Sequence, residues 1–242
     1  LTASVDTKEI LFLAGQKSHG YGAHEHKAGS MLLARCLNES GLNINAEVVI
    51  DGKWPQREYE ARPDSVVMYC DGYKRHMAKE HQSEIQAWVD HGVGVACLHF
   101  AVEVEPEHLG AQFLDWIGGY FEIGWSVNPH WVADFKNFPE HPITRGVQPF
   151  SILDEWYYHM RFQPEMKGVT PILSALPPVQ SLTDRSEDTN RGSNPTVLAS
   201  VKAGEQQHVA WAYERPDGGR GFGFTGGHFH KNWQQDDFRK LV

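Results

Sequence analysis

The sequence predicts a single α/β domain built on a doubly wound, mainly parallel β-sheet. Short apolar runs typical of buried strands alternate with segments of helical periodicity through the first half of the chain. Helices that connect parallel strands cover both faces of such a sheet. The length of 242 residues allows one large core, and a composition of 40% hydrophobic and 22% charged residues is typical of a globular protein.

The predicted elements follow the chain in the order that this architecture requires. In the first half, strands are predicted at residues 9–14, 46–51, 64–71 and 92–98, and helices at 25–37, 80–91 and 106–117. In the second half, strands are predicted at 196–201, 208–213 and 221–225, a surface loop at 181–194, and a helix from Asp236 to the end. A glycine-rich turn at 215–219 indicates that the last two strands form a hairpin.

The strand of residues 92–98 ends at His99, which is the most informative residue of the sequence. In a doubly wound sheet, the sharp turn after a central strand points one side chain into the crevice at the carboxyl edge, where ligands bind. A histidine there suggests a metal ligand, a general base or a polar binding group. Asp71 and the loop with His19 and His24 also follow strands, so we expect them at the same edge.

Other histidines and acids offer further candidates. His228 and His230 lie two residues apart in a segment predicted to be extended, so both imidazoles could face one point. If residues 24–26 belong to a helix, His24 and His26 diverge and only one can be a ligand. Glu103 and Glu105 are interpreted as solvated or capping residues.

Asp154 and Glu155 stand beside three aromatic residues, Trp156, Tyr157 and Tyr158. Acids next to aromatic rings indicate a sugar site, where rings stack on C–H faces and carboxylates accept hydrogen bonds from hydroxyls. The alternative is an ordinary alternating strand with one wet face.

Charge and composition exclude several classes of partner. A net charge of -9 argues against a nucleic-acid or anionic-membrane surface. The longest apolar runs fall far short of the roughly 20 residues of a membrane span, so a soluble protein is expected. The loop at 15–24 lacks a phosphate-binding glycine pattern, so no nucleotide is expected. Three scattered cysteines predict neither a disulfide framework nor a zinc knuckle.

The compartment stays open between cytoplasm and periplasm or exterior. The chain begins at Leu1 without a methionine, as removal of a signal peptide or a tag would leave it. A homo-oligomer is an open alternative.

Taken together, the motifs resemble those of the ThuA-like (trehalose utilisation) family over nearly the whole chain. The resemblance implies that residues 1–242 form a single ThuA-like domain. The motifs that carry the resemblance are Ile10–Ala14 followed by Ser18-His19-Gly20, His24-Glu25-His26, Asp71-Gly72-Tyr73, the strand and elbow Gly94–His99, His141-Pro142-Ile143-Thr144, Asp154-Glu155 and Gly226-Gly227-His228.

The resemblance implies a flavodoxin-like fold of the class I glutamine amidotransferase-like type. In such amidotransferases the elbow carries a nucleophilic cysteine and a later glycine-rich strand supplies the histidine of the triad. His99 stands in place of that cysteine, and His228 is similar in position to the triad histidine. Glutamine hydrolysis is therefore not expected, because imidazole is a poor substitute for a thiolate. The family is associated with disaccharide catabolism, which implies a carbohydrate ligand and a divalent metal, with zinc expected.

Three functions follow as hypotheses. The first is a metal-assisted enzyme that isomerises or cleaves a disaccharide or 3-keto-sugar by proton abstraction. The second is a non-catalytic carbohydrate-binding accessory protein, and the third is an amidotransferase-like hydrolase. The predicted catalytic residues are His99, Glu155 and His228. The predicted metal ligands are His19, His24, His99, His228 and His230. The predicted substrate-binding residues are Asp71, Tyr73, Trp125, Trp156, Tyr157 and Trp233.

Overall fold

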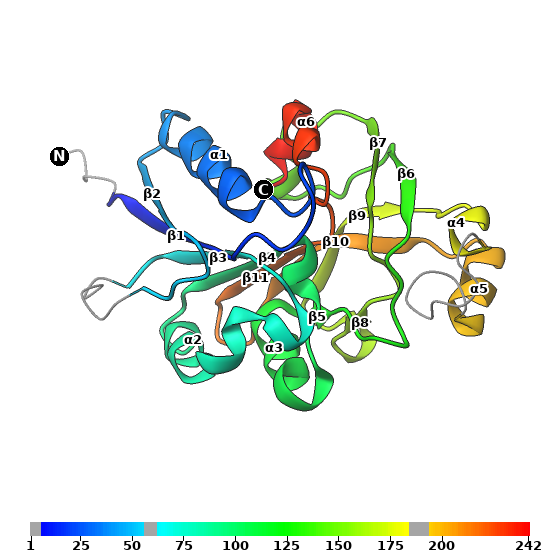
Figure 1. Ribbon diagram of the computed structural model, residues 1–242, viewed down its shortest axis with the longest axis horizontal. Coiled ribbons are helices and arrows are strands. Elements are labelled where there is room, and N and C mark those ends of the chain that lie inside the picture. Colours follow the sequence, from blue (N-terminus) through cyan, green and yellow to red (C-terminus); the bar gives the residue numbers. More distant parts are fainter. Residues whose placement is uncertain (1–5, 56–61, 184–193) are drawn as a thin grey trace.

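A seven-stranded β-sheet forms the centre of the computed structural model, which describes residues 6–55, 62–183 and 194–242 (Figure 1). The strand order is β2-β1-β3-β4-β11-β10-β9. The bounds of these strands are β1 (Lys8–Ala14), β2 (Ile44–Val49), β3 (Ser65–Tyr69), β4 (Gly94–Leu98), β9 (Val169–Ala175), β10 (Gln207–Glu214) and β11 (Arg220–Phe224).

The first five strands of the sheet, from β2 to β11, run parallel. β10 pairs antiparallel with β11 and with β9, so β9 again has the direction of the parallel strands. The parallel part has the order 2-1-3-4-5 that defines flavodoxin-like sheets, which confirms the predicted fold class. In such a sheet the carboxyl ends of the strands meet at one edge, and the strand order reverses between β1 and β3.

Helices and a hairpin cover both faces of the sheet (Figure 1). One face packs against α1 (His26–Asn38), α6 (Asp236–Lys240) and the hairpin of β6 (His130–Phe135) with β7 (Phe150–Glu155), and the other against α2 (Gln82–Val89) and α3 (Ala111–Ile117). The remaining short elements are β5 (Gly119–Tyr120), β8 (Arg161–Phe162), α4 (Gln180–Thr183), α5 (Pro195–Lys202), a π-turn at Pro106–Gly110, and 3-10 turns at Tyr73–Arg75, Met77–Glu80, His99–Val102, Pro142–Thr144, Pro164–Met166 and His230–Gln234. None of the helices in the described parts of the chain has the length and apolar content needed to cross a bilayer.

One segment of the second half differs from the sequence prediction, and a second lies mostly outside the described residues. Residues 196–201 form most of helix α5 rather than a strand. The Asn194 side chain accepts hydrogen bonds from the backbone N–H groups of Thr196 and Val197, and Pro195 occupies the first turn, so capping decides in favour of the helix. Of the predicted loop at 181–194, residues 184–193 lie outside the described part of the chain.

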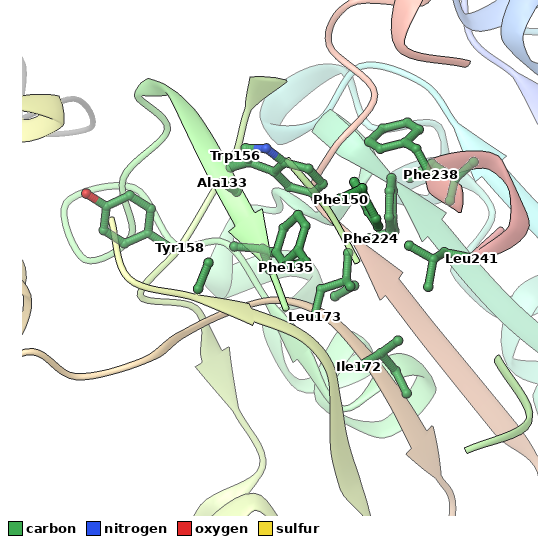
Figure 2. Packing of buried hydrophobic residues seen from close by; sticks show 14 of the residues in the cluster. Ala133, Phe135, Phe150, Trp156, Tyr158, Ile172, Leu173, Phe224, Phe238 and Leu241 are labelled. Carbon is green, nitrogen blue, oxygen red and sulfur yellow. The ribbon is translucent and has the colours of Figure 1, made fainter. Parts of the chain in front are cut away.

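The aromatic residues of β7 and β11 fill the core under the hairpin. Figure 2 shows Trp156 packed among Phe135, Phe150 and Phe224. Trp156 is fully buried, so it anchors the end of β7 and thereby fixes the position of its neighbour Glu155.

Candidate metal centre

Four side chains from distant parts of the chain meet at the carboxyl edge of the sheet. His24 follows β1, His99 follows β4, Glu155 ends β7, and His228 follows β11. His24 Nε2 lies 3.2 Å from His99 Nε2 and 3.0 Å from His228 Nδ1. Glu155 Oε2 lies 3.0 Å from His228 Nδ1, 3.5 Å from His99 Nε2 and 4.0 Å from His24 Nε2. We call these four residues the His/Glu cluster.

His99 occupies the predicted elbow. Its φ of 54° places an L-residue in the left-handed region, a strained conformation that is common at functional sites. His99 Nδ1 lies 2.8 Å from the carbonyl oxygen of Thr225, at the end of the neighbouring strand β11. A carbonyl can only accept, so Nδ1 carries the ring hydrogen and Nε2 presents its lone pair to the cluster. This tautomer is the one that a metal ligand needs.

His24 reaches the cluster because helix α1 begins two residues later, at His26. Its φ is 48°, and its backbone N–H donates to the carbonyl of His228 at 3.0 Å. His26 turns the other way, and its Nδ1 lies 3.0 Å from the carbonyl of Gln16. Of this pair, only His24 joins the His/Glu cluster.

The Asp154 carboxylate fixes the backbone around His228. It is fully buried, and its carboxylate accepts hydrogen bonds from the backbone N–H groups of Gly227 (2.7 Å) and His228 (3.0 Å) and from Asn232 Nδ2 (3.0 Å). Gly227 adopts a φ of 107°, which a residue with a side chain rarely adopts. The chain therefore makes a sharp, fixed turn that aims His228 at Glu155.

Glu155 uses both oxygens. Oε2 faces the imidazoles and accepts a hydrogen bond from the Tyr157 hydroxyl at 3.4 Å. Oε1 lies 3.3 Å from Asn128 Nδ2 and 3.7 Å from His130 Nε2. His130 and Glu155 are directly opposite each other in the β6–β7 register, which explains this contact. The His130 side chain is 40% exposed, so it connects the buried cluster to solvent.

Burial and neighbouring charges determine the protonation of the cluster. Burial, reinforced by His99 and His19, lowers the pKa of His24 far below its ordinary value. Burial alone would raise the pKa of Glu155, but its contacts with the His228 and His99 imidazoles outweigh burial and hold that pKa well below its usual range. Neutral imidazoles and an ionised carboxylate are the forms that bind metals.

The donor set fits a tetrahedral divalent ion. Ligand bonds of about 2.0 to 2.1 Å imply donor-to-donor distances of about 3.3 Å in a tetrahedron. The five measured donor separations run from 3.0 to 4.0 Å. Three histidine nitrogens and one carboxylate oxygen are a donor set that zinc and several transition metals accept. The structure thus contains a buried group that could hold a metal ion.

A second polar group lies beside the first, around Asp71 after β3. Asp71 Oδ1 accepts from Ser18 Oγ at 2.5 Å and lies 4.0 Å from His19 Nδ1, 4.0 Å from His24 Nδ1 and 3.9 Å from His26 Nε2. Asp71 Oδ2 pairs with Arg75 at 3.0 Å. His19 stacks on His24 with ring centroids 3.6 Å apart and is partly exposed. His19 and Asp71, both predicted site residues, therefore flank the cluster rather than complete it.

His230 does not join the cluster, contrary to the prediction that it and His228 face one point. A 3-10 turn begins at His230, which breaks the two-residue alternation of an extended chain. Its backbone N–H donates to the carbonyl of Gly22, and its side chain lines a separate groove with Tyr21 and Lys231.

The predicted substrate-binding residues have mixed positions. Trp156 and Trp233 are 0% and 1% exposed, so their burial corrects the expectation that they form a binding surface. Tyr157 is also buried, but its hydroxyl lies 3.5 Å from His99 Nε2. The ring of Trp125 lies against the Arg161 guanidinium, 3.7 Å from centroid to carbon, and the ring of Tyr73 lies near Lys74. Those two aromatic rings are thus engaged by cations outside the cluster.

Sequence reasoning missed His130 as a neighbour of Glu155. Glu103 and Glu105, predicted to be solvated or capping, are each 6% exposed, so neither is solvated, and they occupy the cap positions of the turns His99–Val102 and Pro106–Gly110. Glu105 pairs with Lys79 at 2.5 Å. Burial, together with the charge of Glu155, raises the pKa of Glu103 to about 8. Only the strand register would have revealed His130, because it lies 25 residues from Glu155 in the sequence.

Comparisons with known proteins agree on one family. The sequence matches the family described as ThuA, trehalose utilisation, over residues 10–242. A ThuA-like protein from Bacteroides uniformis has a similar structure, with a TM-score of 0.66 and 17% identity over 99% of this chain and 89% of its own. A second, from Parabacteroides merdae, gives a TM-score of 0.56 and 16% identity over 92% of this chain and 80% of its own. No curated protein matches the sequence.

Proposed function

The chain belongs to the ThuA family, and on that premise we propose that it is a metal-assisted enzyme that acts on a disaccharide or 3-keto-sugar. The family suggests a role in trehalose utilisation, and therefore in carbohydrate metabolism. The observation that carries the metal-assisted part is the His/Glu cluster, in which four donors from four strand ends face one point. We propose His24, His99, His228 and Glu155 as the ligands and zinc as the ion.

A bound divalent ion supplies a Lewis acid that polarises a carbonyl oxygen of a keto-sugar and so acidifies the neighbouring C–H group. The ligand residues contribute orientation. His99 is fixed by the Thr225 carbonyl, and Asp154 fixes the backbone of His228. The imidazoles of His99 and His228 are therefore already oriented toward the cluster, without rearrangement.

Proton abstraction requires a base that the substrate can reach. His130 meets this condition, because its ring is 40% exposed and its Nε2 lies 3.7 Å from Glu155 Oε1. A carboxylate beside an imidazole orients the ring and stabilises the imidazolium that forms when the ring takes a proton. We therefore assign His130 as the base and Glu155 as the residue that orients it, in addition to its role as a ligand.

One observation favours a second candidate, a non-catalytic carbohydrate-binding protein. Catalytic zinc sites keep an open position, whereas structural sites have four protein ligands. The cluster offers four protein donors, and His24, His99 and Glu155 are at most 2% exposed. A structural ion that braces the strand ends would use the same residues.

The hydrolase alternative has little support. Cys97, two residues before the elbow, is fully buried, and burial raises the pKa of its thiol well above the ordinary value. Burial also raises the pKa of Cys70 to about 12. Neither thiol is a ready nucleophile, because the thiolate is the reactive form.

Metal content and turnover together test the proposal. The protein loaded with Zn²⁺ should convert 3-keto-trehalose to a new product detectable by mass spectrometry, and chelation should abolish that conversion. His99→Gln should lower the affinity for Zn²⁺ by roughly 100-fold or more. His130→Gln should retain the ion and lose turnover by about 100-fold or more, as expected for a base.

A matched control is His208→Gln, because His208 is a partly buried histidine on strand β10 that hydrogen-bonds Ser174 and belongs to none of the possible metal-binding groups among the described residues. This variant should keep both metal and turnover. A protein that binds Zn²⁺ and sugar but gives no product with any variant would support the accessory role. A protein that retains no metal at all would rule out the proposal.

A further inference from the structure

A groove lies where the loop after β1 meets the turn after β11. Its volume is about 660 Å³, within the range of about 300 to 1,000 Å³ that is typical of sites for small organic ligands. The loop and the turn line it with two aromatic rings and several polar side chains, namely Lys17, Tyr21, Glu25, Phe229, Lys231 and Gln234. We call it the Tyr21 groove.

Tyr21 combines an exposed ring with a fixed backbone. The residue is 99% exposed, more than any other exposed large hydrophobic residue in the described parts of the chain. The backbone N–H of Ala23 donates to the carbonyl of Gly20 at 3.2 Å, which closes a turn around Tyr21. The carbonyl of Gly22 accepts from the backbone N–H of His230 at 2.9 Å. A ligand can therefore stack on this ring without the cost of ordering the loop.

Phe229 supplies the second ring and connects the Tyr21 groove to the His/Glu cluster. Its ring centroid lies 4.6 Å from that of His228 and 5.3 Å from that of His130. Its backbone forms an antiparallel bridge with Ala23, so the segments that carry the two aromatic rings lie side by side. A ligand in the groove that contacts Phe229 is therefore one ring away from the proposed metal ligand His228 and the proposed base His130.

Hydrogen-bonding groups accompany both rings. Lys17 Nζ lies 5.9 Å from the centroid of the Tyr21 ring, and Lys231 Nζ lies 5.5 Å from that of Phe229. The Tyr21 ring stays exposed, so Lys17 does not cover it. Glu25 Oε1 accepts from Lys17 at 3.0 Å, and the Glu25 carboxylate offers further lone pairs as acceptors. The groove thus combines aromatic faces with donors and acceptors.

This combination favours a neutral, hydroxylated ring as the ligand. A pyranose presents apolar C–H groups on its faces, which pack on aromatic rings, and hydroxyl groups at its edge, which both donate and accept hydrogen bonds. The Glu25 carboxylate would repel an anionic ligand, and the ammonium groups of Lys17 and Lys231 would repel a cationic one. A wholly apolar ligand would remove water from these charged groups without replacing its hydrogen bonds.

We propose that the Tyr21 groove binds the pyranose ring that does not react, while the other ring of a disaccharide lies at the His/Glu cluster. The inference rests on the proposed function, which supplies the reacting ring. A monosaccharide cannot occupy both places at once. Contacts with the ring that does not react also help to position the reacting ring, because binding energy from a remote part of a substrate can lower the barrier. The groove therefore selects disaccharides over monosaccharides.

Trehalose binding to the chelator-treated protein tests the groove without a metal. Isothermal titration calorimetry should give similar dissociation constants for the wild type and Tyr21→Phe, because both keep the aromatic ring. Tyr21→Ala and Phe229→Leu should each bind trehalose about 10-fold more weakly, as expected for the loss of one stacking contact. The matched control is Leu42→Ala, which changes a 64% exposed residue outside the groove and should bind like the wild type. Thermal unfolding shows whether each variant is folded.

Turnover separates this inference from the proposed function. In the Zn²⁺-loaded protein, Tyr21→Ala should lower kcat/KM for 3-keto-trehalose about 10-fold and leave kcat/KM for 3-keto-glucose unchanged. An equal loss for both keto-sugars would overturn the assignment of the groove to the ring that does not react.

The binding results have equally definite outcomes. Equal trehalose affinity of the wild type and Tyr21→Ala, or no measurable trehalose binding by the wild type, would overturn the groove and leave the metal-assisted reaction intact. Trehalose binding that depends on Tyr21, without turnover of either keto-sugar by any form, would support the groove as a sugar site and contradict the proposed enzyme.

Discussion

His76 and His24 have the same burial and opposite surroundings. Each is 2% exposed, and burial lowers the pKa of both, that of His76 to about 4. His76 Nε2 donates to the carbonyl of Ala101 at 2.9 Å, and its Nδ1 accepts from the backbone N–H of Ala78 at 3.0 Å. Backbone groups satisfy both nitrogens of His76, whereas the nitrogens of His24 face imidazoles and carboxylates.

This contrast shows that burial does not distinguish a structural histidine from a candidate ligand. The hydrogen-bond partners of the ring distinguish the two. A ring whose nitrogens are both bonded to backbone groups cannot also bind an ion, whereas a ring surrounded by other acceptors needs a cation between them.

Asp154→Asn should cost about 3 kcal/mol of folding free energy, because it weakens several charge-assisted hydrogen bonds at a fully buried site. The variant should also bind Zn²⁺ more weakly, since Asp154 fixes the turn that carries His228. Urea unfolding and metal titration measure the two effects. Loss of stability with unchanged affinity for Zn²⁺ would show that the cluster does not depend on this anchor.

His76→Gln should destabilise the protein by about 2 kcal/mol, because glutamine cannot satisfy both the Ala101 carbonyl and the Ala78 N–H in the same geometry. Its affinity for Zn²⁺ should not change. His24→Gln should show the reverse, with a cost below about 1 kcal/mol in the metal-free protein and a loss of Zn²⁺ affinity. Equal effects of the two substitutions on stability and on metal binding would break the comparison.

Glu103→Gln should remove a pH dependence of stability. The pKa of Glu103 is about 8 in the folded protein and near 4.5 in an unfolded chain. Between these values the folded state keeps a proton that the unfolded state has lost, so stability falls as pH rises, by up to about 1.4 kcal/mol per pH unit. Denaturant unfolding at pH 5, 6, 7 and 8 should therefore give a flatter profile for the variant. Parallel profiles would mean that Glu103 is ionised in the folded protein.

The fold was accessible from the sequence because its signals are local. Apolar runs such as residues 92–98 and the amphipathic segment that became α1 need no knowledge of distant partners. Capping by Asn194 outweighs the strand-like composition of residues 196–201, and that signal is also local.

Only part of the site could be predicted from the sequence. His99 and His24 follow strands, and parallel topology alone brings such residues to one edge. The turn that removes His230 from the cluster, the register that pairs His130 with Glu155, and the packing that buries Trp156 depend on contacts between segments far apart in the chain. Periodicity in a single sequence does not report such contacts.

The bond between His24 and His228 joins positions 204 residues apart. An ion held there would act as a cross-link between the beginning and the end of the chain. Such a link cannot form on a growing polypeptide until the last strand has been synthesised, so metal acquisition would come late in biogenesis. A chain truncated before residue 228 would lack this closure, however well its first four parallel strands assemble.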